Sequence, residues 1–407
     1  MSETLFVRAR TIVTCDTAAA QGGIDFARLG AIDDGALLVR DGRIAALGPE
    51  EDVVVRLSAG ARELDLRDCV VVPGLVDAHC HPLFAGDREP YFAARLRGEP
   101  PPLGMPYTIE RTRDALLDPG AFYHGTVRAR LETILAHGTT TLETKTGYAL
   151  HKPGESELLD LIAAHRGDAR VPRLIATFLG AHALPPEFTR EDAFVDYLID
   201  QCLPAAKSHG AVYADAFCEP GWFSAEQTRR YLEAARGHGL RLRVHCDEMA
   251  YGGAARMAAE LGVDAIDHAN FITEADVRAI ADREIVTVAC PATIAYLDLP
   301  RAAPVRDLLS RGASVAFASD YNPGTSPCFN LQTVAYYARK IFGLTAAEAL
   351  YGVTRAAARS LRVEAGALRP GGEADFVALR IGSPDEFGWQ FGGNLAAAVV
   401  RSGALAA

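Results

Sequence analysis

Short runs rich in Val, Ile, Thr and aromatic residues alternate with longer helical patterns through the middle of the chain. Runs of this kind predict buried parallel strands, and helical periodicity separates them, for example over 228–237 and 274–283. Eight β/α units within about 290 residues are typical of an α/β fold of the (β/α)8 class, the TIM barrel. The predicted strands cover 71–76, 139–144, 173–179, 212–217, 240–245, 265–268, 286–289 and 314–320.

The two ends of the chain have a different pattern. Residues 35–40 and 43–48 flank Asp41-Gly42, a strong signal for a type I′ hairpin. Near the other end, 372–379 and 396–403 also predict strands with glycine-rich turns. We therefore expect a small composite β-sandwich domain from residues 1–70 and 363–407, and a catalytic TIM-barrel domain over 71–362.

The totals narrow the class of protein. A chain of 407 residues is too long for one ordinary core. Its net charge of −11 argues against nucleic acid as a partner. The N-terminal residues lack a signal-peptide pattern, and no apolar run reaches about 18 residues. Eight cysteines without a C-x-x-C pair fit a reduced compartment. We expect a cytoplasmic protein that binds neither nucleic acid nor membrane.

Active sites of TIM barrels lie at the C-terminal ends of the strands, and polar residues gather at these positions. His79 and His81 follow the first strand with i, i+2 spacing, so both imidazoles can face one point. Later strand ends carry Lys145, Tyr148, His182, Cys218, Glu219, His245, Asp247, Glu248, Asp267, His268 and Asp320. We interpret the six remaining histidines as surface or structural: His124, His137, His151, His165, His209 and His238.

Three imidazoles and one carboxylate suit a divalent metal with an open position for water. Asp320 is placed to bind the metal, the water or both. Glu248 can reach substrate or water, and His268 can stabilise an oxyanion or carry protons. The alternatives are a surface or helix N-terminal carboxylate for Glu248 and a structural ion pair for Lys145.

These residues carry a family resemblance. The string Pro73–Asp77, the His79-x-His81 pair, the later strand-end histidines and Ser319-Asp320 resemble the amidohydrolase superfamily over nearly the whole chain. Within it, five longer strings resemble the imidazolonepropionases, which open the imidazolone ring in histidine degradation. They are residues 84–89, 143–148, 178–185, 217–219 and 320–327.

The resemblance implies roles for single residues. His79, His81, His245 and Asp320 would hold one metal, zinc or iron, and no lysine on strand four is present to hold a second. The resemblance also assigns catalysis to Glu248, His268 and Asp320. It assigns the small-molecule substrate, a carboxylate, to Arg88, Tyr148, His182, Asn322 and Gly324. A homodimer is common in such families.

Two segments depart from the imidazolonepropionase pattern. Gly98–Tyr107 has three consecutive prolines, at 100–102, in place of a glycine string, and Cys290–Tyr296 lacks paired aromatic residues. Tyr321 and Cys328 are also atypical. We expect both segments to face the ring substituent, with Met105, Cys290 or Tyr321 as soft neighbours.

Besides action on other cyclic amide or deaminase substrates, three functions stay open. One is imidazolonepropionase itself. Another is a desulfhydrase that hydrolyses the thiocarbonyl of 3-(5-oxo-2-thioxoimidazolidin-4-yl)propionate, in ergothioneine degradation. The third is a non-catalytic scaffold, which a metal assay would distinguish because a scaffold should purify without stoichiometric metal.

Overall fold

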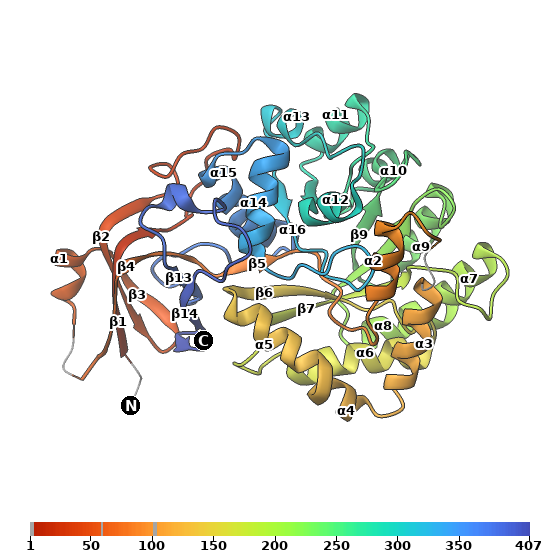
Figure 1. Cartoon of the computed structure of the whole chain (residues 1–407), viewed down its shortest axis with the longest axis horizontal. Coiled ribbons are helices and arrows are strands. Elements are labelled where there is room, and N and C mark those ends of the chain that lie inside the picture. Colours follow the sequence, from red (N-terminus) through yellow and green to blue (C-terminus); the bar gives the residue numbers. More distant parts are fainter. Residues whose placement is uncertain (1–3, 58–59, 101–103) are drawn as a thin grey trace.

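The computed structural model describes residues 4–57, 60–100 and 104–407. Two sheets lie at opposite ends of an elongated molecule, a mixed sheet from both chain ends and a parallel barrel (Figure 1). The predicted fold class is confirmed. The predicted wall at Gly98–Tyr107 includes Pro101 and Pro102, which lie outside the described residues. No described helix combines the length and apolar character that crossing a membrane would need.

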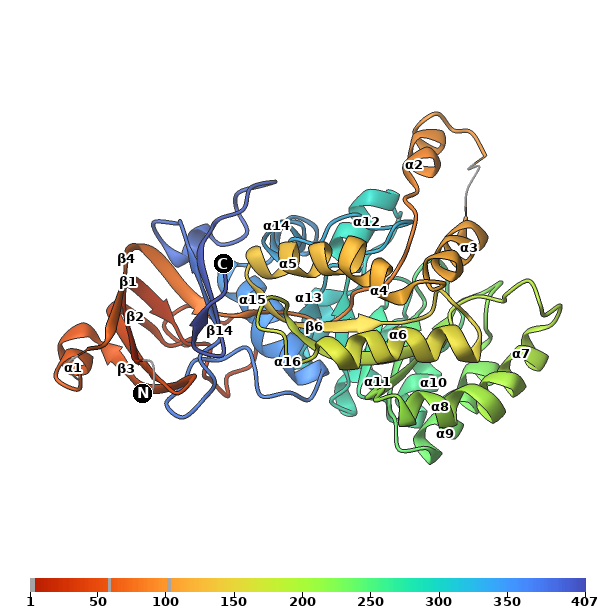
Figure 2. The ribbon, with the colours of Figure 1, turned by 90° about the horizontal axis from the view of Figure 1, so that it is seen from below.

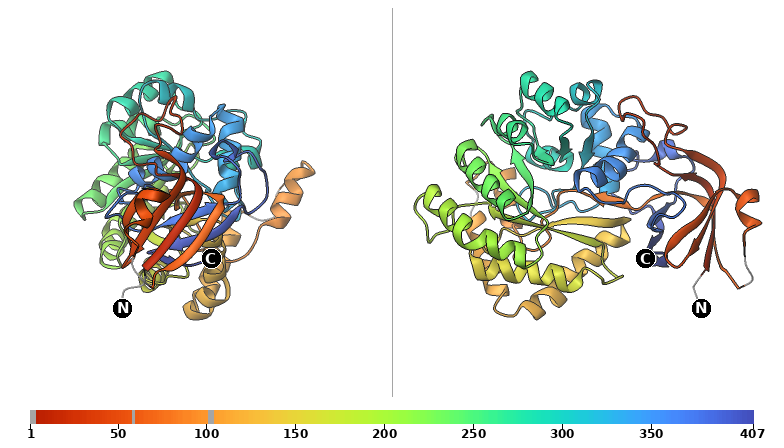
Figure 3. Two further views of the ribbon diagram at one scale, coloured as in Figure 1. Left: turned by 90° about the vertical axis from the view of Figure 1, so that its left-hand side faces the viewer. Right: turned by 180° about the vertical axis from the view of Figure 1, so that it is seen from behind.

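The mixed sheet joins strands from the start and the end of the chain, which lie side by side in both views of Figure 3. β4 is central to it, because it pairs in parallel with β1 and antiparallel with β13. In order across the sheet the strands are β15 (Ala404–Leu405), β14 (Ala396–Arg401), β13 (Phe376–Leu379), β4 (Arg62–Pro73), β1 (Thr4–Val13), β2 (Ala31–Arg40) and β3 (Arg43–Pro49). Hydrogen bonds therefore join these strands in one continuous mixed sheet, where the sequence analysis predicted a β-sandwich from the same two chain ends.

The predicted hairpin between β2 and β3 is confirmed. Asp41 and Gly42 have φ values of 50° and 74°, the positive values that a type I′ turn requires at both central positions. Val7, Val71 and Phe376 are buried together on one face of the mixed sheet. Phe6, Leu38 and Val53 of α1 (Glu50–Val54) form a smaller cluster. The chain ends are thus held by apolar packing as well as by strand pairing.

The barrel contains eight parallel strands in sequence order. They are β5 (Leu75–Asp77), β6 (Thr139–Lys145), β7 (Arg173–Ala181), β8 (Tyr213–Cys218), β9 (Arg241–Cys246), β10 (Ala265–His268), β11 (Val286–Ala289) and β12 (Val315–Phe317). Past the ends of β5 and β12, the Asp320 N–H donates to the His79 carbonyl at 2.9 Å and the His81 N–H to the Tyr321 carbonyl at 3.0 Å. This closure brings the two histidines of the first strand next to Asp320.

Helices surround the barrel and follow its strands. They are α2 (Glu89–Leu96), α3 (Met105–Ala115), α4 (Pro119–Phe122), α5 (Arg128–Ala136), α6 (Lys152–His165), α7 (Glu191–Tyr197), α8 (Leu203–Ser208), α9 (Ala225–Gly237), α10 (Ala254–Leu261), α11 (Glu274–Asp282), α12 (Pro291–Leu297), α13 (Val305–Ser310), α14 (Leu331–Phe342), α15 (Ala346–Tyr351) and α16 (Ala357–Ser360). Three π-helical turns, η1 (Tyr123–Val127), η2 (Leu198–Cys202) and η3 (Gly352–Ala356), continue α4, α7 and α15, and η4 (Pro384–Glu386) is a 3₁₀ turn.

Gly74 marks the passage from the mixed sheet into the barrel. Val71–Pro73 belong to β4 and pair with β13, so the first barrel strand begins at Leu75 rather than at residue 71 as predicted. A Cβ atom on Gly74 would lie 2.1 Å from Thr140 Oγ1 on the neighbouring strand. Glycine at this position leaves room for the Thr140 side chain.

α2 and α3 follow the first barrel strand, and α2 stands out from the body of the molecule in Figure 2. The last residues of the segment Gly98–Tyr107 are helical, because Met105 begins α3. Gly104 precedes the helix, and Pro106 lies in its first turn. A backbone N–H at this position would have no partner within the helix, so a proline there costs no hydrogen bond. Met105 is consequently held by a helix at the barrel mouth.

Candidate active site

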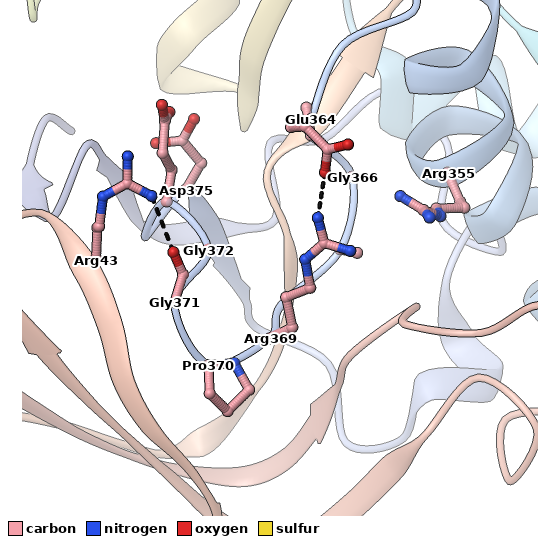
Figure 4. Close-up of a pocket in the computed structure, with 12 residues that line it drawn as sticks. Arg43, Arg355, Glu364, Gly366, Arg369, Pro370, Gly371, Gly372 and Asp375 are labelled. Carbon is pink, nitrogen blue, oxygen red and sulfur yellow. Dashed lines mark hydrogen bonds and ion pairs between the residues drawn. The ribbon is translucent and has the colours of Figure 1, made fainter.

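Two cavities compete as the functional site. The larger one, about 450 Å³, lies beside the mixed sheet, where Arg369 pairs with Glu364 and Arg43 donates to the Gly371 carbonyl (Figure 4). None of the predicted site residues lines it. The other cavity, about 330 Å³, is lined by nine of them: His81, Arg88, Tyr148, His182, His245, Glu248, His268, Asp320 and Asn322. We assign the active site to this second cavity, because the chemically reactive residues line it, although its volume is smaller.

Four predicted ligands converge at its floor. The Nε2 atoms of His79 and His81 lie 3.1 Å apart, and each lies 3.4 Å from Asp320 Oδ1. His79, His81 and His245 bring their ligand atoms within 4.8 Å of one another. All four side chains are buried. Closure of the barrel between β5 and β12 supplies three of these residues, and β9 supplies His245.

The protonation pattern of this group fits a cation. His79 Nδ1 lies 2.8 Å from Asp267 Oδ2, so Nδ1 carries the proton and Nε2 presents a lone pair. Burial lowers the pKa of His79 and of His245 to about 4, which keeps both imidazoles neutral at pH 7. Burial alone would raise the pKa of Asp320, but His79 and His81 hold it well below its ordinary value. Lone pairs from these groups meet at one point, which a positive ion would stabilise.

The spacing also fits a metal. Ligands at about 2.0–2.1 Å from a tetrahedral ion lie roughly 3.3–3.4 Å from one another. The observed separations of 3.1 and 3.4 Å among His79, His81 and Asp320 are close to this edge length. The donor set therefore suits a divalent metal ion.

A buried ionic network orients the histidines from below, and the sequence analysis did not identify it. Asp267 faces His79 Nδ1, and Asp215 Oδ2 lies 3.1 Å from His245 Nδ1. Lys145 Nζ lies 2.6 Å from Asp215 Oδ2 and 3.4 Å from Asp267 Oδ2. Carboxylates behind metal-binding histidines set the tautomer and the orientation of the ring. The only signal in the sequence was the presence of charges inside apolar strands.

Two further charged residues complete this network. Glu143 Oε1 lies 2.8 Å from Lys145 Nζ, and Arg243 donates to Asp267 Oδ1 at 2.8 Å. Burial would lower the pKa of Lys145, but the surrounding carboxylates raise it above its usual value. Lys145 is therefore a cation that bridges the carboxylates behind two histidines, which agrees with the ion-pair alternative in the sequence analysis.

Glu248 and His268 face each other beside the four ligands, with Oε2 and Nε2 3.7 Å apart. Burial raises the pKa of Glu248 to about 7, a value suited to proton transfer near neutrality. Burial would lower the pKa of His268, but Glu248 and Asp320 raise it above its ordinary value. A carboxylate and an imidazole in this state can exchange protons with a reacting group.

Glu219 anchors the loop that carries Glu248, a role that the sequence analysis did not predict. Both oxygens of Glu219 accept backbone N–H groups, from Glu248 at 2.8 Å, Met249 at 2.9 Å and Ala250 at 2.6 Å. Glu219 follows β8, as the sequence analysis noted, but its function is to hold the next loop. A carboxylate with three such donors fixes the backbone from which Glu248 projects.

Arg88 reaches the same cavity from the loop before α2. Its Nε donates to Thr108 Oγ1 at 2.8 Å, and Nη2 lies 3.7 Å from the Met105 sulfur. Within the described ranges, no carboxylate lies in ion-pair distance of Arg88, and burial lowers its pKa. A Cβ on Gly324 would lie 2.4 Å from Arg88 Nη1, so Gly324 gives room to the guanidinium and does not line the cavity as predicted.

Tyr148 and His182 form the wall next to His81. His182 donates from Nδ1 to the Gly147 carbonyl at 2.8 Å, and its ring stacks on His81 with centroids 5.5 Å apart. Burial raises the pKa of the Tyr148 hydroxyl, which therefore stays protonated as a donor. Glu155 accepts the N–H groups of Gly147, Ala149 and Leu150 and holds this loop in place.

Asn322 is held at the cavity edge. Its Nδ2 donates to Asp320 Oδ1 at 3.1 Å, while its Oδ1 accepts the Gly324 N–H at 2.8 Å. Asp320 has φ of 49° and His268 has φ of 67°, values that cost non-glycine residues roughly 1–3 kcal/mol. Two strained residues at one site indicate that their side-chain positions matter.

The prediction for Cys290–Tyr296 is wrong, because none of these residues lines the active-site cavity. The segment enters α12, and Thr293 donates from Oγ1 to Asp320 Oδ2 at 2.7 Å. Cys290 is buried behind the site, and Tyr321 lines a neighbouring cavity. Among the three predicted soft neighbours, only Met105 faces the active site. Cys328 is outside the cavity as well.

The fold and the site together define a barrel hydrolase whose ligand set suits a metal. A model of the amidohydrolase family matches residues 70–403. The chain belongs to the amidohydrolase family.

Relatives and solved structures agree with this assignment. The chain is 36% identical to an imidazolonepropionase of Solibacter usitatus, over 99% of this chain and 98% of that protein. It is 40% identical to one of Ralstonia nicotianae, over 93% and 94%. In fold it is similar to E. coli guanine deaminase, with a TM-score of 0.73 and 18% identity over 99% of this chain and 98% of that one. A triazine hydrolase variant gives 0.74 and 20%, over 99% and 94%.

Proposed function

We propose that this protein hydrolyses the ring of an imidazolone-type propionate, as an imidazolonepropionase. The proposal rests on two features of one cavity. Its floor is formed by four residues that suit a metal ion, and its wall includes Arg88, a buried guanidinium with no carboxylate partner among the described residues. A planar fork of this kind matches a carboxylate such as propionate. Relatives that bear this enzyme's name match the chain nearly end to end, which supports the same substrate class.

His79, His81, His245 and Asp320 would hold the metal, which we propose to be zinc, with iron as the alternative that the same ligands accept. When bound, a divalent metal supplies Lewis acidity and brings the pKa of a water ligand toward neutrality. Asp267 and Asp215 would keep the histidine rings in the tautomer that binding requires.

The side chains around the floor perform the proton transfers. Glu248 accepts the proton of the attacking water as the new C–O bond forms at the ring carbonyl carbon. His268 stabilises the negative charge that develops on the carbonyl oxygen. The ring C–N bond then breaks, and Glu248 returns the proton to the leaving nitrogen. Arg88, with Tyr148 and His182 beside it, holds the propionate and thereby the orientation of the ring.

One observation supports a second candidate, the 2-thioxo analogue of the ring. Met105 lines the cavity next to Arg88, and a thioether is a soft, polarisable neighbour for sulfur. The reaction would then replace the thiocarbonyl sulfur with oxygen from water and release sulfide. Met105 alone favours this substrate, because Cys290 and Tyr321 lie outside the cavity.

The test compares both compounds with zinc-loaded protein, following ring opening by absorbance and sulfide by a colorimetric assay. We expect ring opening of imidazolone propionate without sulfide release. H245A should lose both metal and turnover, while R111K, at an exposed arginine of α3, should behave as wild type. A preference for the thioxo compound by at least about tenfold in kcat/KM would favour the second candidate. Failure of zinc-loaded protein to turn over either compound would reject the substrate class.

A further inference from the structure

We propose that the cavity beside the active site is a second binding site, for a carboxylate that carries a planar ring. This cavity, of about 430 Å³, shares Arg88 and Asn322 with the active site, and its other walls include Arg130 and Tyr321. Neither Arg130 nor Tyr321 takes part in the proposed reaction. The inference rests on the proposed function only where it takes Arg88 as the contact for the substrate's carboxylate.

Arg130 is the residue that points to an anionic ligand. It belongs to α5, and its Nη1 donates to the carbonyls of Pro82 and Phe84 at 3.1 and 2.5 Å. Its guanidinium carbon lies 3.7 Å from the centroid of the Phe84 ring. Among the described residues, none accepts a hydrogen bond from its Nε or Nη2, and no carboxylate forms an ion pair with it. Burial lowers the pKa of Arg130, so this fixed cation lacks an anion that would stabilise it.

Tyr321 adds a neutral donor to this cation. Its ring stands edge-on to the Phe84 ring, with centroids 5.8 Å apart. Burial raises the pKa of Tyr321, so its hydroxyl stays protonated at neutral pH and can donate to a carboxylate. The cavity thus combines an arginine and a tyrosine, as the active site does with Arg88 and Tyr148. Tyr321 is also a residue by which the chain departs from the imidazolonepropionase pattern, and the second site gives it a function.

Aromatic side chains give the cavity walls that suit a flat ring. Phe92 of α2 stacks on Tyr296 of α12, with ring centroids 5.1 Å apart and planes inclined by 21°. Arg95 donates to the Leu297 carbonyl at 3.0 Å and holds α2, the helix that stands out in Figure 2, against α12. Aromatic rings pack on such walls in offset or edge-on arrangements. A ligand that joins a planar ring to a carboxylate therefore fits both the walls and the cationic end of the cavity.

Two acidic residues limit the negative charge that the site can accept. Asp87 and Glu89 also line the cavity, but both are exposed to water and neither forms an ion pair with Arg88 or Arg130. Charges at an exposed rim act more weakly than charges in the interior, because water screens them. One carboxylate next to Arg130 is therefore favoured, while a ligand with several negative charges is repelled at the rim.

The shared arginine couples the two cavities. Because Arg88 lines both of them, a carboxylate held by Arg130 attracts the same guanidinium that would hold the substrate's propionate. Two ligands that draw on one cation oppose each other, and this coupling is reciprocal. The second molecule should therefore bind more weakly than the first.

The experiment measures bound 3-phenylpropionate, a ring carboxylate that the enzyme cannot hydrolyse, by equilibrium dialysis of the zinc-loaded protein. Wild type should bind two molecules per chain at saturation. R130Q should weaken one of them at least about tenfold, as expected for a lost charge-assisted hydrogen bond, and Y321F should weaken the same one about 2–10-fold. R128Q, on the same helix but paired with Glu132, should bind as wild type does. So should Y336F, because Tyr336 lines neither cavity.

Circular dichroism shows first whether each variant is folded. If R130Q does not fold, Y321F decides, because it removes one oxygen atom and keeps the ring. One bound molecule per chain in wild type, or unchanged binding of both molecules in the folded variants, would overturn the second site. Turnover of imidazolone propionate by the same preparation tests the proposed function separately. Turnover with one bound ligand rejects only the second site, and two bound ligands without turnover reject only the proposed function.

Discussion

Replacing Lys145 by Met should weaken both the fold and metal binding. The ammonium group is fully buried among three carboxylates, with Nζ distances of 2.6 Å to Asp215, 2.8 Å to Glu143 and 3.4 Å to Asp267. Without Lys145, Arg243 is the remaining buried cation that pairs with this group. Removing one partner of a buried ion pair typically costs about 3–5 kcal/mol, and we expect a loss of this size in the free energy of unfolding.

The second effect acts through the histidines. Asp215 and Asp267 use the same oxygen atoms, Oδ2, to face Lys145 and the ring nitrogens of His245 and His79. Without the bridging cation these carboxylates take up protons or turn away, and the rings lose their fixed orientation. Disturbing such outer partners costs about 10–100-fold in metal affinity, or about 1.4–2.7 kcal/mol.

Urea unfolding of the metal-free protein measures the first effect, and zinc competition with a chelator measures the second. K207M is the matched control, since it makes the same substitution at an exposed lysine and should change stability by less than about 0.5 kcal/mol. If K145M does not fold, D267N keeps the shape of the side chain and should still lower zinc affinity. Wild-type zinc affinity in K145M or D267N would refute the coupling, and unchanged stability in K145M would refute the ion-pair argument.

Further substitutions test other parts of the site. Arg88→Lys keeps the charge but loses the fork, so KM should rise more than kcat falls; equal losses on an analogue without the propionate would contradict the assigned contact. Glu248→Gln should retain the proposed zinc ion and lower kcat about 100-fold or more, and normal turnover would show that Glu248 has only a structural role. Glu219→Gln should weaken the anchor of the Glu248 loop, lowering kcat while zinc content and circular dichroism stay as in wild type; an unchanged kcat would limit Glu219 to a structural role. Gly74→Ala places a methyl group against the Thr140 side chain and should destabilise the protein by about 1–3 kcal/mol in urea unfolding, with partial rescue by Thr140→Ala; wild-type stability would show that the Thr140 side chain can move aside.

The barrel was predictable because its strands are apolar runs that end in polar residues. β11 and β10 have the predicted bounds, and the hairpin at Asp41-Gly42 has the predicted turn. The start of the barrel was not predictable in the same way. The apolar run through Gly74 crosses two sheets without a change of composition, and only the contact with Thr140 shows where one ends.

The site was partly predictable for a related reason. A strand end shows which side chains reach the barrel mouth, so the four proposed metal ligands and Glu248 could be placed there, and the family resemblance suggested their roles. Asp215 and Lys145 are paired across 70 positions, a contact that no local pattern encodes. The Cys290–Tyr296 segment failed because a departure from a family pattern does not tell which way a segment faces, and α12 turns it behind Asp320.

The position of β4 between β1 and β13 has a consequence for synthesis of the chain. β13 leaves the ribosome roughly 300 residues after β4, which corresponds to about 15–60 s at about 5–20 residues per second. During that interval the edge of β4 that includes the apolar residues Val70, Val71 and Val72 is unpaired, and it can form strand pairs with another nascent chain. Arrested translation before Phe376 should therefore yield chains that aggregate or recruit chaperones, although the barrel strands have all been made.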